Sequence, residues 1–463
     1  MAGFLDKERI IAGPGFNRWL VPPAALCIHL CIGMAYGFSV FWLPLSQAIG
    51  ITKPVACAAD VGLIGSLFTT ACDWKVADLG WMYTLFFVLL GSSAAFWGGW
   101  LERVGPRKAA FVSTLCWCGG LLISALGIYW HQLWLMWVGS GVIGGIGLGL
   151  GYISPVSTLV KWFPDRRGMA TGMAIMGFGF AAMLFGPIMA KLFQLMDIWK
   201  VYILLGVVYF CLITCSSLYI APPPKGWLPK GMREAPAGAG DETAPKRAVR
   251  RDLAQMTVKE AIRTKRVYFM RVMLFINITC GIALISVASP MAQEVTGMSA
   301  MQAAAMVGLM GLFNGGGRIG WASFSDIIGR PVTFMAFFVI QVVAFLTLST
   351  VSDAFAFQCL IMLIITCYGG GFSTLPAFLG DMFGTKQLGT IHGFELTAWG
   401  IAGIVGPTIV TKVLEATGSY TTTLHIFAGF LAVAFLVSCL MAKEIKAKRQ
   451  WYAQQQNEEG VSA

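Results

Sequence analysis

Glu102-Arg103-Val104-Gly105 ends one long apolar stretch, and Asp326-Ile327-Ile328-Gly329 ends another 224 residues later. A second pair of matching positions, Gly186-Pro187 and Gly406-Pro407, is offset by 220 residues. Both pairs fall within sequence that is apolar enough to cross a membrane. Two similar membrane halves in one chain are typical of transporters that rock around a central site. We therefore expect a protein that moves a solute across a membrane.

The composition excludes an ordinary soluble protein. Hydrophobic residues make up 57% of the chain and charged residues 12%, and the mean hydropathy is +0.72. A helix needs about 20 apolar residues to cross the hydrocarbon core. Twelve stretches qualify, at residues 19–45, 78–100, 109–130, 133–160, 168–193, 199–221, 268–292, 301–325, 331–351, 354–380, 389–412 and 421–443. Because lipid leaves backbone groups without partners, and these runs are too long for barrel strands, we expect twelve helices.

The twelve stretches divide into two groups of six, in residues 1–221 and 268–444. A polar linker, residues 222–267, separates them, and residues 445–463 form a tail. We expect the Gly/Ala/Pro-rich first part of the linker to be disordered. Residues 252–266 are predicted to form a short amphipathic helix on the inner membrane surface. A solvated linker that carries inside charges is the alternative.

The net charge of +11 follows membrane topology rather than nucleic-acid binding. If the first stretch begins on the inner side, 26 of the 33 Lys and Arg residues lie inside and five lie outside. This asymmetry places both termini in the cytoplasm. We expect the lipid bilayer, and no nucleic acid, as a partner.

Neither the cysteines nor the other reactive side chains in the sequence indicate a catalytic or metal-binding site. Ten of the twelve cysteines lie in the apolar stretches, where they are expected to pack as small apolar residues. Cys57 and Cys72 lie in the outward loop 46–77, where an oxidising compartment would favour a disulfide and unsuitable geometry would forbid one. We expect no metal, no cofactor and no enzyme activity, since no nucleophile–base pair stands outside a packing context.

The two inner loops that follow the second and eighth stretches are the predicted gates. Their glycines permit tight turns and close helix approach, and their acids and bases can pair across the two halves. Such a pair locks the inner face in one state and breaks in the other. Turn chemistry with inside charges is the alternative, but it accounts less well for two copies. The expected gate residues are Gly98, Glu102, Arg103, Gly105, Arg107, Asp326, Gly329 and Arg330.

Arg318 is the sharpest single candidate, because the eighth stretch places it inside the membrane. An arginine there costs at least ~2.5–3.5 kcal/mol and cannot lose its proton. It therefore needs a carboxylate or water, and its planar fork suits a carboxylate. Asn314 lies one turn earlier on the same helix face and is expected to help position a ligand. The alternative is an arginine that snorkels at the loop edge.

The eleventh stretch carries His392, Glu395 and Trp399 on one helix face. We hypothesise that Glu395, with His392, takes up a co-transported proton, or that Glu395 pairs with Arg318 when no substrate is bound. The alternative is that both face water at the inner mouth. His29, in the first stretch, is expected to be a hydrogen-bonded packing residue.

These motifs resemble one branch of the major facilitator superfamily, the oxalate/formate antiporter family, which includes bacterial lactate and pyruvate transporters. The resemblance covers almost the whole membrane portion. The stretches that carry it are Asn17-Arg18-Trp19, residues 161–168, Leu312-Phe313-Asn314-Gly315-Gly316 with Arg318, and Asp381-Met382-Phe383-Gly384-Thr385. It implies an all-α major facilitator fold of twelve transmembrane helices in two pseudo-symmetric six-helix bundles, in a bacterial inner membrane.

The resemblance also implies a substrate site. The arginine that matches Arg318 binds the substrate carboxylate in that family, and Tyr152 and Asn314 match residues that line the site in lactate transporters. The residues expected to wall the cavity are Tyr36, Tyr368 and Phe372. Where the oxalate exchanger carries a second cation, this chain has Trp399, so one carboxylate fits better than two.

We therefore expect a monomeric, proton-coupled transporter of a monocarboxylate such as lactate, pyruvate, glycolate or formate. An oxalate/formate-type anion antiporter remains the first alternative, with a counter-anion in place of the proton. Multidrug export and a non-transporting carboxylate sensor are remoter ones.

Overall fold

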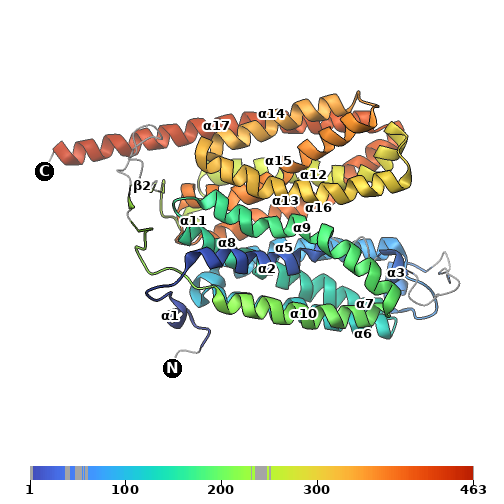
Figure 1. Ribbon diagram of the computed structural model, residues 1–463. Coiled ribbons are helices and arrows are strands. Elements are labelled where there is room, and N and C mark those ends of the chain that lie inside the picture. Colours follow the sequence, from blue (N-terminus) through green and yellow to red (C-terminus); the bar gives the residue numbers. More distant parts are fainter. Residues whose placement is uncertain are drawn as a thin grey trace.

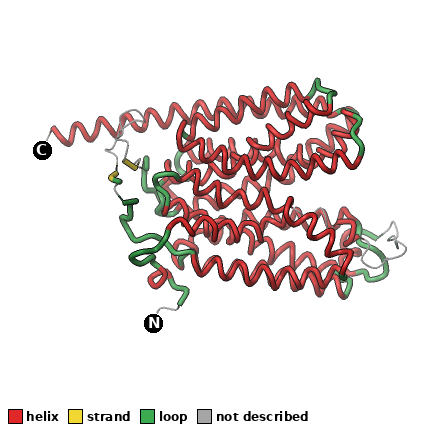
Figure 2. Tube along the Cα trace, in the orientation of Figure 1, coloured by secondary structure: helices red, strands yellow, loops and turns green. Residues whose placement is uncertain are grey.

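The computed structural model describes residues 4–36, 42–46, 55, 57, 61–230, 232–234, 248–249 and 252–461. Figure 2 shows long helices running between two ends of the molecule, with the loops gathered at those ends. Both chain ends lie at the same end in Figure 1, which we call the terminal face. The opposite end carries α3, Trp42–Ser46, and we call it the loop face.

The N-terminal half contains the helices up to residue 219. Their bounds are α1 Lys7–Ile10, η1 Arg18–Leu20, α2 Val21–Gly33, α3 Trp42–Ser46, α4 Leu63–Phe68, α5 Val76–Val104, α6 Pro106–Tyr129, α7 Leu133–Met136, the π-helical η3 Trp137–Ile143, α8 Gly144–Trp162, α9 Arg167–Leu195 and α10 Ile198–Tyr219. The predicted first span, 19–45, corresponds to η1, α2 and α3, and its residues 37–41 lie outside the described residues.

The linker contains β1 Arg233–Glu234 and β2 Ala248–Val249, which pair in parallel, and α11 Val258–Ala261. The C-terminal half comprises α12 Lys265–Thr296, α13 Ala300–Ile328, α14 Arg330–Leu348, α15 Ala354–Phe383, α16 Leu388–Thr417 and α17 Tyr420–Val461. The expected tail from residue 445 is not a separate element, because α17 continues as one helix to Val461.

Eleven helices in the described part of the chain are long and apolar enough to cross a membrane. The helix α13 is not among them, although its 29 residues are long enough to span. It carries Asn314, Arg318 and six glycines in residues 308–320, which lower its hydropathy. With α13 included, the described part of the chain has twelve long helical segments, the number that the sequence predicts.

The two halves meet along two pairs of helices, α5 with α16 and α9 with α13. Close approach on the terminal side depends on glycine. A Cβ added at Gly98 of α5 would lie 2.6 Å from the Cα of Thr390 on α16. The terminal ends of the halves are therefore in backbone contact, as small residues allow in a membrane.

The linker differs from its prediction as an amphipathic helix over residues 252–266. Helix is confined to α11, and α12 begins at Lys265. The backbone N–H groups of Leu253 and Met256 donate to carbonyls at the end of α15 instead of to their own helix. These two hydrogen bonds hold residues 253–256 against the end of α15 in a non-helical conformation.

Candidate functional site

The predicted substrate residues lie together in the middle of the bundle. Arg318, Tyr152, Tyr368 and Trp399 are all fully buried, and Phe372 is 1% exposed. The indole of Trp399 lies 4.7 Å from the ring of Phe372 and 5.9 Å from that of Tyr152, between ring centroids. Four helices, α8, α13, α15 and α16, therefore bring these side chains to one place.

Arg318 is held in a fixed orientation with one nitrogen left over. Its Nε donates to Asn314 Oδ1 at 3.0 Å, and its Nη1 donates to the carbonyl of Ile175 on α9 at 3.2 Å. Its Nη2 has no hydrogen-bond partner among the described residues, although it is buried. Unpaired buried donors are costly, so this nitrogen is suited to an anionic ligand.

Aromatic rings surround the guanidinium of Arg318. Its central carbon lies 5.1 Å from the ring of Phe372 and 5.9 Å from the rings of Tyr36 and Phe178. These are cation–π distances. The site therefore has aromatic walls and a cation at its centre.

Two tyrosines bridge the halves beside this cation. The hydroxyls of Tyr36, which follows α2, and Tyr368 of α15 lie 3.4 Å apart. Tyr368 packs on Gly281 of α12, where an added Cβ would overlap the phenol ring. Its carbonyl accepts from Asn277 Nδ2 at 3.3 Å, which fixes this turn of α15.

The candidate proton-coupling residues are buried rather than open to water. Glu395 is fully buried and His392 is 1% exposed. Neither the carboxylate of Glu395 nor the ring of His392 has a hydrogen-bond partner among the described residues. The ring of His392 lies 5.6 Å from that of Tyr152, which links it to the aromatic cluster.

The expected pairing of Glu395 with Arg318 does not occur in this structure. The fork of Arg318 is directed to Asn314 and Ile175 instead. A second intramembrane arginine, Arg271 of α12, lies beside the turn that carries Glu395. It donates to the carbonyl of Phe394 at 2.7 Å and to Thr397 Oγ1 at 2.6 Å.

His29 fits its expected packing role. Its Nε2 lies 3.4 Å from the carbonyl of Tyr152, and its ring stacks on the Tyr152 ring at 5.2 Å.

The two predicted gate acids bind the starts of helices in the opposite half. Glu102 of α5 accepts from the N–H of Gly389 in α16 at 3.0 Å. Asp326 of α13 accepts from the N–H groups of Gly168 and Met169 in α9 at 2.9 and 2.8 Å. The first N–H groups of a helix lack acceptors within the helix and attract negative charge. Each acid therefore caps a helix across the interface.

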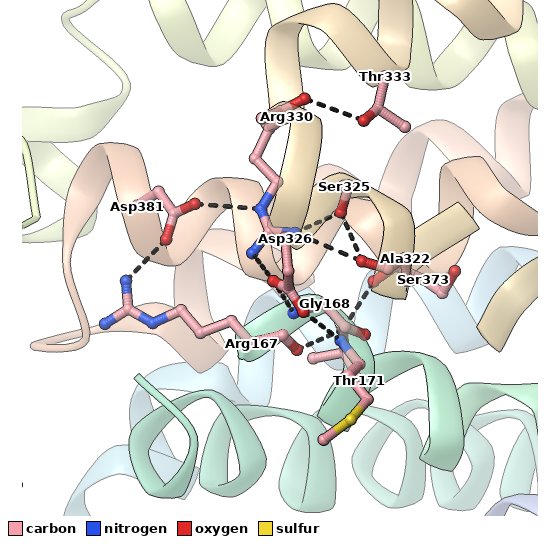
Figure 3. Close-up of polar contacts among 12 residues, drawn as sticks. Arg167, Gly168, Thr171, Ala322, Ser325, Asp326, Arg330, Thr333, Ser373 and Asp381 are labelled. Carbon is pink, nitrogen blue, oxygen red and sulfur yellow. Dashed lines mark hydrogen bonds and ion pairs between the residues drawn. The ribbon is translucent and has the colours of Figure 1, made fainter. Parts of the chain in front are cut away.

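Arginines tie the α9–α13 side further. Arg330 of α14 contacts Asp326 and also Asp381 at the end of α15, at 3.1 Å to the latter. Arg167, the first residue of α9, reaches Asp381 at 2.8 Å from the other half. Figure 3 shows Asp381 between the two arginines. This cluster holds the terminal face closed.

The remaining gate predictions divide into turn and surface positions. Gly105 and Gly329, which follow α5 and α13, have φ of +92° and +89°, a conformation that favours glycine. Arg103 is exposed. Arg107 lies 5.9 Å from the ring of Phe4, so it contacts the N-terminal segment rather than the opposite half.

Sequence reasoning missed several contributors. Phe178 lies in an apolar run of α9, where one phenylalanine gives no signal. Arg167 and Asp381 stand in motifs that we quoted, but their pairing joins positions 214 residues apart. Arg271 is a charged residue within the seventh apolar stretch, and the rule that a charge inside a membrane span marks a functional site would have found it.

On the loop face, Cys57 and Cys72 form a disulfide, with Cα atoms 5.0 Å apart. The next residues pack on the turn between α6 and α7. Trp74 stacks on His131 at 4.5 Å, and His131 Nε2 lies 2.9 Å from the carbonyl of Cys72. The loop is thus joined to the N-terminal half.

Comparison with known proteins agrees with this architecture. The family model described as Major Facilitator Superfamily matches residues 26–407. An uncharacterised MFS-type transporter of Escherichia coli strain K12 is 24% identical over 389 residues, covering 84% of this chain and 86% of the relative. An oxalate:formate antiporter of Oxalobacter formigenes is 23% identical over 429 residues, covering 91% and 92%. An apicoplast pyruvate carrier of Toxoplasma gondii is 22% identical, covering 69% and 66%.

Solved structures share the fold at low identity. The human organic anion transporter MFSD10 superposes with a TM-score of 0.67 at 16% identity, covering 92% of this chain and all of that one. The transporter FucP in the outward conformation gives 0.65 at 14% identity, covering 92% and 99%. The matched family model spans most of the chain and the relatives are transporters rather than enzymes. This chain is a multi-pass membrane transporter that belongs to the Major Facilitator Superfamily.

Proposed function

We propose that this protein transports a small monocarboxylate together with a proton by alternating access. The carboxylate binds Arg318 near mid-membrane, and the aromatic rings around it select a small organic tail. The terminal face is the cytoplasmic side of a bacterial inner membrane, in keeping with its excess of Lys and Arg.

Arg318 carries this proposal. It is a permanently charged, fully buried cation whose Nη2 lacks a partner among the described residues, while its other contacts are to neutral oxygens. An isolated buried charge is strongly unfavourable. A bound carboxylate would neutralise it and accept from its free nitrogen, together with the unpartnered Tyr152 hydroxyl and Trp399 Nε1 in the same cluster.

The number of cations at the site argues for one carboxylate. Trp399 supplies a neutral N–H and a flat ring where a second cation would suit a dicarboxylate. The names of the relatives include both an oxalate:formate antiporter and a pyruvate carrier. Anion exchange without proton movement is therefore the alternative that must be tested.

Glu395 is the proposed proton carrier. A carboxyl group buried without a hydrogen-bond partner is most stable when neutral, and His392 lies three residues away on the same face. Protonated Glu395 would let the loaded transporter rock without moving an uncompensated negative charge. Release of that proton at the far side would then accompany release of the substrate.

Proteoliposomes that contain the purified protein test this function. We expect an inward proton gradient to drive uptake of labelled lactate, with no oxalate uptake. Glu395→Gln should remove gradient-driven uptake while leaving exchange of lactate for lactate intact, because exchange needs no net proton movement. Oxalate exchange that is indifferent to the gradient would instead identify an anion antiporter.

A further inference from the structure

Residues 252–258, which we call the linker strap, lie alongside the turn between α15 and α16. Four hydrogen bonds attach this strap to the C-terminal half. They run from Leu253 N–H to the Asp381 carbonyl at 2.9 Å, from Met256 N–H to the Phe383 carbonyl at 2.8 Å, from Thr385 N–H to Gln255 Oε1 at 3.1 Å, and from Val258 N–H to Gln387 Oε1 at 2.8 Å. The strap is thus part of the C-terminal half, although the linker connects both halves.

Asp252 at the start of the strap reaches the other half. Nη1 of Arg167, the first residue of α9, donates to Asp252 Oδ1 at 2.5 Å and to Asp381 Oδ1 at 2.8 Å. Gln255 Nε2 donates to Asp252 Oδ2 at 2.8 Å and so orients the carboxylate. The side chains of Arg167 and Asp252 are 7% and 11% exposed, which limits screening by water.

We propose that the linker strap is a latch that holds the terminal face closed through Asp252. Arg167 belongs to one half, whereas the strap and Asp381 belong to the other. Movement that parts α9 from α15 must therefore break the Asp252–Arg167 contact as well as the gate itself. A contact made in only one state shifts the population toward that state. The latch acts whatever solute the central site binds.

Three backbone N–H groups report whether the gate is closed. Gly168, Met169 and Gly389 lie in the first turns of α9 and α16, where a helix offers no acceptor of its own. In the described part of the chain, their acceptors are Asp326 and Glu102 of the opposite half. Their exchange with deuterium should be slow while the halves are together and fast when the terminal face opens.

Hydrogen–deuterium exchange of the full chain in nanodiscs, at one pH and without substrate, tests the latch. Asp252→Lys sets a cation against Arg167, and Asp252→Ala removes the contact without repulsion. Asp197→Lys is the matched control, since Asp197 is an exposed loop-face acid whose partner is Lys200. We expect gate peptides to exchange at least about tenfold faster in Asp252→Lys, less so in Asp252→Ala, and as wild type in the control.

Deuterium exchange at the backbone amides of the strap distinguishes a latch from a clamp within the C-terminal half. Faster exchange at Leu253 and Met256 with an unchanged gate would show that the strap is only a clamp on the C-terminal half and would overturn the latch. Unchanged exchange at both places would overturn it too, since Asp252 would then contribute nothing to docking. Because no solute is present, a failure of the proposed substrate assignment leaves these outcomes unaffected.

Discussion

Arg318→Lys is the substitution that tests the substrate site most directly. The arginine uses Nε and Nη1 for Asn314 and Ile175, which aims Nη2 into the aromatic cluster. Lysine keeps the charge but has one ammonium on a flexible stem, so it cannot hold both tethers and present a planar fork. One charge-assisted hydrogen bond is worth about 2 kcal/mol, and weaker contact with the three rings costs about 1 kcal/mol more. Together these correspond to roughly 100-fold weaker binding.

Calorimetric titration of lactate into purified protein measures this loss, and lactate counterflow in proteoliposomes checks it. The matched control is Arg271→Lys, which alters the other intramembrane arginine that bonds a carbonyl and a side-chain oxygen. We expect its lactate affinity to stay within about threefold of wild type, since it lies outside the aromatic cluster. A folded Arg318→Lys variant that binds lactate as tightly as Arg271→Lys would refute the assignment.

Further predictions concern the packing around the site and the loop face. Gly281→Ala should push the Tyr368 ring from α12 and destabilise the protein by about 1–3 kcal/mol in thermal unfolding, whereas Gly308→Ala, which meets open space, should not. On the loop face, burial lowers the pKa of His131, so its neutral form favours the docked loop. Docking should therefore weaken as the pH falls below the usual histidine value of about 6.5. Reduction of Cys57–Cys72 by a phosphine should accelerate from pH 7 to pH 5 in wild type but not in His131→Gln; equal acceleration in both would contradict this role.

Local patterns in the sequence predicted local structure well. Apolar length predicted the long helices, and the four-residue spacing of Asn314 and Arg318 predicted a shared helix face, on which the structure places a hydrogen bond between them. No local spacing in the sequence identifies which residues of one half contact which residues of the other. Arg167 and Asp381 are 214 residues apart and meet only because two bundles dock at their terminal ends. The structure does not contain the Glu395–Arg318 pair that was one of the two hypotheses for Glu395, since Arg318 bonds Asn314 on its own helix and Ile175 on α9.

The repeat that predicts two matching halves also explains why the gate is not symmetric. Glu102 and Asp326 are equivalent by the 224-residue offset, and each caps a helix of the opposite half. Their neighbours differ. The ends of α8 and α15 are related by the 220-residue offset, and at the equivalent position the first half has Lys161 whereas the second half has Asp381. Lys161 neutralises Glu102 within its own half at 2.8 Å.

Asp381 cannot neutralise Asp326, so Arg330 bridges the two acids, and Arg167 reaches Asp381 from the other half. The acid at position 381 therefore adds an ion pair between the halves, with Arg167, to the pairs that Arg330 makes within the C-terminal half. The α9–α13 side consequently holds more cross-half charge contacts than the α5–α16 side. It is this side on which the linker strap docks, because only there does an arginine of the N-terminal half lie within reach of Asp252 in the described structure.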